Sequence, residues 1–200
     1  MLHNLANRIA SVFVLYGEST EENADIYAYA CEAVLAFLVN LLICIAIALL
    51  FGRIIEGIVF IAAFALLRRY TGGYHASAHY KCILIFGSIL TCSMILLNLS
   101  LLIDAGRVIA LVIATIAGVG IFALTSVENK RNPSNEDFRR SSKHVSRWIS
   151  FILWLFCIIN YFIFDNPIGF AISLSMFSVF VSAAYVKISN YFNFRKVVEL

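Results

Sequence analysis

The chain has 200 residues, of which 62% are hydrophobic and 14% charged, and its formal net charge is +3. Soluble domains usually contain about 45–50% apolar and about 25% charged residues. The composition therefore excludes an aqueous globule, and the long apolar runs predict an all-α, polytopic membrane protein in the lipid bilayer. The small net charge gives no reason to expect a nucleic-acid partner.

The N-terminal region, residues 1–28, predicts an interfacial helix followed by a linker. Apolar residues within 2–16 follow helical i, i+3, i+4 spacing and are separated by polar ones, unlike the continuous apolar region of a signal peptide. We expect an amphipathic helix on the membrane surface; the alternative is a first helix docked against its own bundle. Residues 29–190 then predict a membrane bundle and 191–200 a cytoplasmic tail, all in one membrane domain over 1–200.

Six apolar segments predict six transmembrane helices, of which the second is short. They are Tyr29–Phe51, Ile54–Leu67, Cys82–Ile103, Val108–Val127, Trp148–Phe164 and Pro167–Val186. The second has 14 residues and is about 21 Å long as a helix, less than the roughly 30 Å hydrocarbon core. It can cross where the bilayer is thin or where protein shields its end. A re-entrant hairpin with the first segment is the alternative.

The basic residues predict the orientation. The loops after the first, third and fifth spans carry only Arg53 and Arg107. The other 13 of the 15 basic residues fall on the opposite side: Arg8, Arg68, Arg69, Lys81, Lys130, Arg131, Arg139, Arg140, Lys143, Arg147, Lys187, Arg195 and Lys196. The positive-inside rule therefore places both termini and the loops 68–82 and 128–147 in the cytoplasm. At the outer side, Glu56 is expected to pair with Arg53 at i, i+3 spacing.

The polar loop 68–82 is the candidate functional site, because it holds two histidines and a cysteine between two apolar segments. A thiolate with a nearby base is a nucleophile for acyl transfer. Cys82 lies where the third span begins, so the helix dipole and free backbone N–H groups favour a thiolate and an oxyanion there. The remaining cysteines lie in apolar stretches and suggest neither a disulfide nor a metal site: Cys31, Cys44, Cys92 and Cys157.

Two histidines compete for the role of base. His79 lies three residues before Cys82, so the two share a face if both are helical. His75 lies seven residues before Cys82 and would stand about 10.5 Å away along a straight helix. It reaches the sulfur only if the chain folds back. Local geometry alone therefore favours His79.

The order of these features resembles the accessory gene regulator B family. The family pattern is a short second span, an Arg-x4-Gly-x-His-x6-Cys loop and a third span that opens at the cysteine; here the loop residues are Arg68, Gly73, His75 and Cys82. The segment 127–130, followed by Pro133, is also similar to the family's sequence after the fourth span, although Arg131-Asn132 before the proline departs from it. The resemblance covers most of the chain.

The resemblance implies a membrane-embedded cysteine endopeptidase of quorum sensing in Gram-positive bacteria, without metal or cofactor. Such enzymes remove the acidic C-terminal tail of a small autoinducer precursor peptide. It implies Cys82 as nucleophile, His75 as base in preference to His79, and Arg68 and Gly73 as supporting residues. The precursor would be held as a thioester until one of its own side chains closes a thiolactone or lactone ring. The family also implies a homodimer in the cell membrane.

Three alternatives accompany this interpretation. A non-enzymatic transporter or export scaffold would need polar groups along a pore, and no charged residue lies deep in spans three to six. A metal-dependent protease would need clustered ligands that the sequence lacks. Glu32 is either a third catalytic group near His75 or an interfacial carboxylate.

The basic loop 128–147 is expected to bind the acidic tail, to fix topology, or both. Pro133 indicates that the loop is non-helical near its start, and residues 134–137 could then cap a short surface helix.

Overall fold

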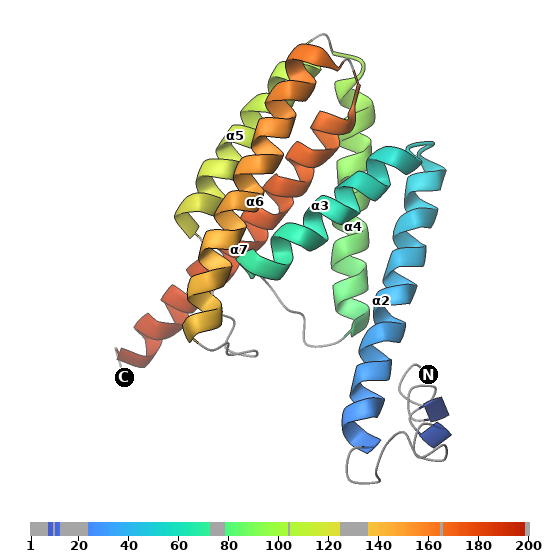
Figure 1. Cartoon of the computed structure of the whole chain (residues 1–200), viewed down its shortest axis with the longest axis vertical. Coiled ribbons are helices and arrows are strands. Elements are labelled where there is room, and N and C mark those ends of the chain that lie inside the picture. The colour runs from blue at the N-terminus through green and yellow to red at the C-terminus, as the bar shows by residue number, and fades with distance from the viewer. Residues whose placement is uncertain are drawn as a thin grey trace. The chain divides into compact units, whose positions relative to one another are not determined.

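The computed structural model describes residues 8–9, 11–12, 24–72, 79–103, 105–124, 136–164 and 166–198, with backbone alone at 24–25, 79, 136–140 and 192–198 (Figure 1). The chain forms two compact units, Met1–Ala46 and Ile47–Leu200, whose boundary falls within one helix. The single domain expected over 1–200 stays a prediction.

The long elements of the described chain are six helices. They are α2 (Ala24–Leu50), α3 (Ile54–Thr71), α4 (His79–Ser100), α5 (Gly106–Leu124), α6 (Glu136–Ile163) and α7 (Ile168–Val198). Within the part of the chain described, five of these are long and apolar enough to cross a membrane, and α3 is not among them. The protein is therefore an all-helical, multi-pass membrane protein, and the expected sixth crossing depends on α3.

Only parts of the expected N-terminal helix are described. Residues 8–9 and 11–12 are helical, and the Ser11 hydroxyl donates a hydrogen bond of 2.8 Å to the Arg8 carbonyl oxygen. The rest of the predicted stretch 2–16 lies outside the described residues. Its amphipathic helix on the membrane surface stays a prediction.

The helices around the candidate site extend past their predicted ends. α3 continues four residues beyond Leu67 to Thr71, and α4 begins at His79 instead of Cys82. Hydropathy marks only the apolar part of a helix, whereas polar residues can continue its backbone hydrogen bonds into the interface. Cys82 therefore lies in the first turn of α4, as its fourth residue.

One prediction about the basic segments was wrong. The short surface helix expected after Pro133 is instead the start of α6, which runs unbroken from Glu136 through the predicted fifth span. Likewise, α7 continues as a helix to Val198, through most of the tail expected over 191–200, whose cytoplasmic position stays a prediction. In both cases a helix extends well beyond its apolar segment, as it can where the backbone satisfies its own hydrogen bonds.

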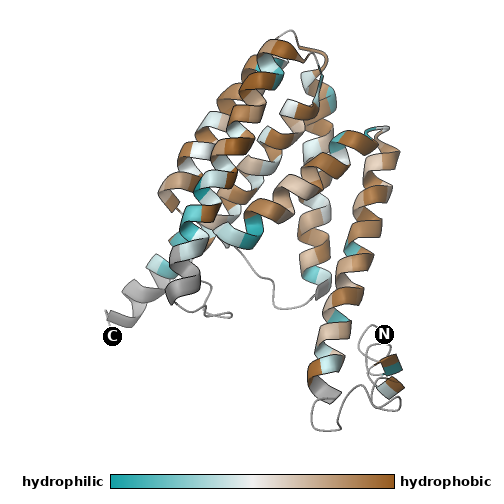
Figure 2. Cartoon of the chain, in the orientation of Figure 1, coloured by the Kyte–Doolittle hydropathy of each residue, from teal (hydrophilic) through white to brown (hydrophobic). Residues whose placement is uncertain are grey.

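Helix α7 is central to the second unit and contacts α3, α4, α5 and α6. α5 buries a stripe of mostly small residues at helical spacing: Gly106, Ala110, Ala114, Ala117 and Ile121. Gly120 of α5 lets the Phe180 ring of α7 lie against its backbone, at a place where a Cβ would collide with the ring. Small residues allow such close approach between membrane helices. Figure 2 shows hydrophobic residues along these helices and hydrophilic ones near the C-terminal end of α3 and the start of α6.

The turn between α2 and α3 is closed by backbone and side-chain bonds. Gly52, at φ 65°, donates its N–H to Leu49 O (3.0 Å), and the N–H of Arg53 bonds to Ala48 O (2.9 Å), which is the Schellman arrangement of a helix end. Arg53 Nη1 lies 3.2 Å from Glu56 Oε1, so the pair expected from the sequence is confirmed. Arg53 Nε also donates to Asn98 Oδ1 of α4 at 3.2 Å, which joins the start of α3 to the end of α4.

Candidate functional site

The C-terminal end of α3 is fixed by a glycine. Gly72 has φ 76° and ψ −159°, a region that is almost exclusive to glycine. Its N–H donates to the carbonyl oxygen of Arg68 at 3.1 Å and so satisfies one of the last carbonyls of the helix. The helix ends there, and Arg68 and Arg69 lie in its last turn, where the helix dipole favours positive charge.

Arg68 lies at the edge of an aromatic cluster. Its guanidinium carbon is 5.4 Å from the centroid of the Phe64 ring, one turn earlier on α3. Phe64 packs in turn on Phe86 of α4, with ring centroids 4.6 Å apart, and Phe60 lies 6.5 Å from Phe86. All three rings are buried, with at most 7% of their surface exposed. Tilted contacts of two α3 rings with Phe86 therefore join α3 to α4.

The same cluster aligns Arg68 with Cys82. Phe86 lies four residues after Cys82, on the same face of α4, just as Phe64 lies four residues before Arg68 on α3. Burial lowers the pKa of Arg68, and the charge of Cys82 acts in the opposite direction and raises it. An arginine is not deprotonated in proteins. The structure thus brings a guanidinium cation within electrostatic reach of the predicted nucleophile.

Cys82 differs from the other four cysteines in its surroundings. It is free and half-buried in the first turn of α4, where backbone N–H groups lack helical partners. Cys157, by comparison, is buried within α6, and its sulfur donates to the carbonyl oxygen of Gly169 at 3.5 Å. A thiolate is favoured by a helix N-terminus and a neighbouring cation and disfavoured by apolar burial. Of these two cysteines, only Cys82 has the first kind of environment.

The two candidate bases are described unequally. His75 and Gly73 lie outside the described residues. His79, of which only the backbone is described, is the first residue of α4. His79 and Cys82 are therefore both helical at i, i+3 spacing, and residues so spaced share a face of the helix. The choice between His75 and His79 therefore stays a prediction. Among the described residues, no three His, Cys, Asp or Glu side chains are grouped as metal ligands.

One polar group of this region was missed by sequence reasoning. Thr71, the last residue of α3, is 0% exposed, and its hydroxyl has no hydrogen-bond partner. An unsatisfied buried hydroxyl costs stability unless another group pairs with it. Thr71 stands three residues after Arg68, and this helical spacing could have predicted that the two residues share a face of α3.

Comparisons with known proteins bear on the family of the chain. Neither the curated proteins nor the solved structures gave a match. The family model for accessory gene regulator B matches residues 6–185. The match covers most of the 200 residues and includes all of the loop 68–82 and the described helices α2 to α6. This protein belongs to the accessory gene regulator B family.

Proposed function

We propose that this protein is a membrane-embedded cysteine endopeptidase that cleaves a small autoinducer precursor peptide and promotes its cyclisation. Membership of the family supports a role in autoinducer peptide processing. The observation that carries the finer proposal is the environment of Cys82: a free thiol in the first turn of α4, electrostatically coupled to Arg68. A helix N-terminus and a nearby cation are surroundings that reactive cysteines in general share.

The proposed chemistry is two successive acyl transfers. His75 takes the thiol proton of Cys82, and the thiolate attacks the carbonyl carbon at the junction between the core of the precursor and its acidic tail. The C–N bond breaks, His75 returns the proton to the leaving amine, and the core stays on Cys82 as a thioester. A side chain of the core then attacks the thioester, gives its proton to His75 and releases the Cys82 thiolate.

Three further groups have roles in this scheme. The free N–H groups at the start of α4 stabilise the oxyanion that forms at each attack. Arg68 holds a positive charge near Cys82. The basic residues of 128–147, seven in number if His144 is included, attract the acidic tail. Closure of a ring instead of hydrolysis requires that the site limit the access of water.

We further propose six crossings, with both termini and the catalytic loop in the cytoplasm, and a homodimeric assembly. Support for α3 as a crossing comes from the bonds at its two ends. Arg53 is joined to Asn98 near the end of α4, and Arg68 is coupled to Cys82 near its start. Arg53 to Arg68 and Cys82 to Asn98 are each about 23–24 Å along a helix. These two interactions therefore lie near opposite ends of both helices.

The decisive experiment traps the intermediate. Purified enzyme in liposomes is mixed with a precursor in which the ring-closing residue is replaced by Ala. We expect an adduct on Cys82 with the mass of the precursor without its tail, released by neutral hydroxylamine, which cleaves thioesters but not amides. A wild-type enzyme that forms no adduct and yields linear product at full rate would contradict cyclisation through Cys82.

The orientation is tested separately by labelling with an impermeant maleimide. Ser77→Cys and Ser141→Cys, each in a protein whose natural cysteines other than Cys82 are replaced, should be labelled only after the membrane is opened. The matching outer position is Ala105→Cys, in the turn before α5, which should be labelled in intact cells. The opposite pattern would contradict the orientation predicted from the basic residues.

A further inference from the structure

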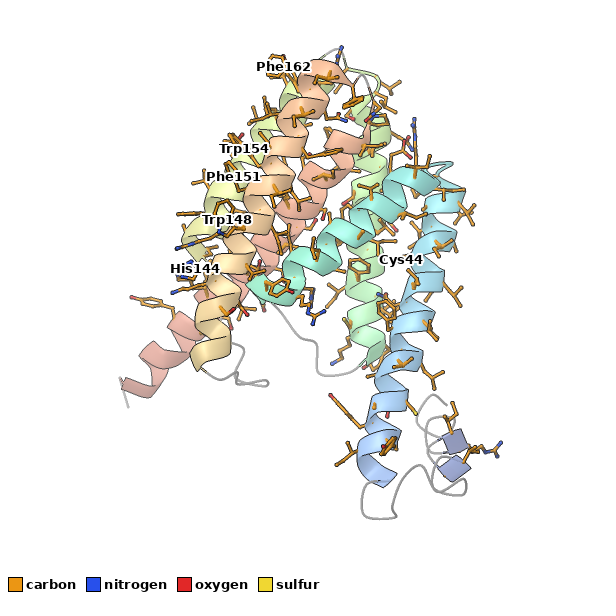
Figure 3. All side chains as sticks on the ribbon, viewed as in Figure 1. Cys44, His144, Trp148, Phe151, Trp154 and Phe162 are labelled. Carbon is orange, nitrogen blue, oxygen red and sulfur yellow. The ribbon has the colours of Figure 1, made fainter. Side chains whose placement is uncertain are left out.

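A lateral groove between α5 and α6 takes no part in the proposed acyl-transfer steps, although His144 and Arg147 at one end of it belong to the basic loop 128–147. It encloses about 630 Å³, and its walls are mainly apolar and aromatic. The lining residues come from two helices: Thr115, Gly118, Val119 and Phe122 from α5, and His144, Arg147, Trp148, Ser150, Phe151 and Trp154 from α6. Figure 3 shows His144, Trp148, Phe151 and Trp154 following one another along α6.

One end of the groove is cationic. Arg147 lies over the Phe122 ring, with its guanidinium carbon 4.3 Å from the ring centroid, and its Nη2 donates only a long bond of 3.4 Å to the Phe122 carbonyl oxygen. Its Nε is buried without a hydrogen-bond partner. Among the described side chains, no carboxylate forms a salt bridge with Arg147. A half-buried guanidinium with an unused donor is a recognition group for an anion.

A second donor lies one turn deeper. Ser150 is 3% exposed, lines the groove and has a hydroxyl with no hydrogen-bond partner. It stands about 4.5 Å beyond Arg147 along α6. Opposite it, Gly118 has no side chain, and an added Cβ would lie 3.8 Å from the Ser150 hydroxyl. The unpaired hydroxyl therefore lies at the wall of the groove, with no side chain of Gly118 covering it.

The far end of the groove is apolar. Trp154 Nε1 donates to Thr115 Oγ1 at 3.0 Å, and Thr115 Oγ1 donates to Leu111 O at 2.8 Å, so the polar groups there are already paired. Trp148 and Phe151 make an edge-on ring contact, with centroids 6.3 Å apart. From His144 to Trp154 the groove follows about 15 Å of helix. That is half of a hydrocarbon core about 30 Å thick, the depth of one leaflet.

We propose that this groove binds an anionic phospholipid, with its phosphate at Arg147 and one acyl chain along the aromatic wall toward Trp154. Ser150 donates to an ester oxygen of the same lipid. Charge, depth and the order of polar and apolar groups all match such a molecule.

The experiment measures lipid retained by the purified full chain. The protein is extracted by mild detergent from vesicles of phosphatidylglycerol and phosphatidylcholine in equal amounts, and bound lipid is counted by native mass spectrometry. We expect phosphatidylglycerol to be preferred by about tenfold or more, the effect of one hydrogen bond to a charged group. Equal retention of the two lipids, or retention of neither, would overturn the proposal.

Paired variants locate the site. Arg147→Gln should abolish the preference, whereas Lys143→Gln, an exposed position one turn earlier that does not line the groove, should preserve it. Gly118→Leu should expel both lipids by filling the groove, while Gly118→Ala places its methyl in ordinary contact and should retain them. Equal effects of Arg147→Gln and Lys143→Gln would reduce the preference to diffuse surface charge and contradict the site.

Competition distinguishes the occupants. Glycerol phosphate, which has the head group chemistry without the tail, should not displace the bound lipid. Displacement by it would define a simple anion site and overturn the lipid assignment. An interchain disulfide formed by Val119→Cys in vesicles would place a second copy of the chain in the groove. That result would also overturn the lipid assignment. None of these measurements uses peptidase activity, so failure here is independent of the proposed function.

Discussion

Each end of α3 places an arginine beside α4, but the groups that surround the two arginines differ. Arg53 bonds to the carboxylate of Glu56 and to the amide of Asn98, two groups that need it for structure. Arg68 lies over the Phe64 ring and is coupled to the thiol of Cys82. An ion pair closes the first end, whereas the second holds a cation beside a group that can become a nucleophile. From this difference we predict that the second end of α3, and not the first, takes part in the proposed chemistry.

The largest effect is expected from Cys82→Ala. Loss of the nucleophile should reduce precursor cleavage by about 10⁴-fold or more, as loss of a nucleophile does in other acyl-transfer enzymes, while the protein still inserts and accumulates. The measurement is product formation in liposomes containing a precursor peptide. Replacement of all four other cysteines is the control and should leave activity largely intact. Normal cleavage by Cys82→Ala would remove the chemical distinction between the two ends of α3.

The next largest effect is expected from the base. A general base contributes about 10²–10⁴ in rate, so His75→Ala should lower kcat/KM by at least about a hundredfold, and His79→Ala clearly less. The same liposome assay measures both. His79 stands at i, i+3 from Cys82 on α4, so it is the proper matched control. A larger loss in His79→Ala would show that local helix geometry, and not the family pattern, identifies the base.

Much of the fold could be predicted from the sequence, because hydropathy and periodicity are local properties. The all-helical membrane class and the pair Arg53–Glu56 both followed from spacing alone. The start of α6 did not, because its first turns are charged and Pro133 suggested a break. The correct signal was present: Ser142, Ser146 and Ser150 recur every four residues and are buried, which is the pattern of a continuous helix face.

The site was less predictable, because it depends on how two helices cross. The spacing of Cys82 and the histidines was legible in the sequence, whereas the coupling of Arg68 to Cys82 requires the Phe64–Phe86 contact that sets α3 against α4. No pattern of neighbouring residues in the sequence predicts that the Phe64 ring contacts Phe86. The groove at Arg147 was missed for the same reason, since it needs α5 and α6 side by side. The sequence suggested only two roles for that arginine, as one of the basic residues of 128–147: binding of the acidic tail and fixing of the topology.

Arg68→Gln should sharpen the comparison of the two ends. Loss of one interaction with a charged group is worth about 1.5–3 kcal/mol, so kcat/KM should fall by about 10–150-fold without loss of accumulated protein. Arg68→Lys should restore part of the rate, because it returns a cation to the end of α3. An Arg68→Gln protein with the kcat/KM of the wild type would reduce Arg68 to a packing residue.

Arg53→Gln should produce the opposite result. It leaves the Glu56 carboxylate, whose side chain is 12% exposed, without its partner. The thermal midpoint in detergent should fall by an amount that corresponds to about 1–3 kcal/mol, while the activity of the folded protein stays close to normal. Arg53→Gln with Glu56→Gln should recover part of the stability, because no unpaired charge remains. A loss of activity as large as that of Arg68→Gln would mean that the ends are not distinct.

The smallest effects are expected at the two glycines that flank α3. Both have positive φ, 65° at Gly52 and 76° at Gly72. Gly52 ends α2 in a Schellman turn, with nothing within 4 Å of an added Cβ, so Asn is tolerated there better than other side chains. Gly72, at ψ −159°, occupies a region almost closed to every other residue. It also starts the segment that leads from Arg68 to His75.

Substitution of each glycine by Ala and by Asn therefore gives four variants whose stability and kcat can be compared directly. Gly52→Ala should cost about 1–2 kcal/mol of stability through left-handed strain, and Gly52→Asn less. At Gly72 both substitutions should cost about 1–3 kcal/mol, and Asn should give no relief. Only the Gly72 variants should also lower kcat, by a few-fold, because relief of strain at Gly72 changes the direction of the chain that leads to the base. Strain at Gly52 affects the Arg53 end of α3, which has no role in the proposed chemistry. Thermal midpoints in detergent and single-turnover rates on the folded fraction measure the two effects. If Gly72→Asn were more stable than Gly72→Ala, as is expected at Gly52, the backbone conformation at Gly72 would be that of an ordinary helix C-terminus and would not oppose substitution. The proposed link between Gly72 and the direction of the following loop would then fail.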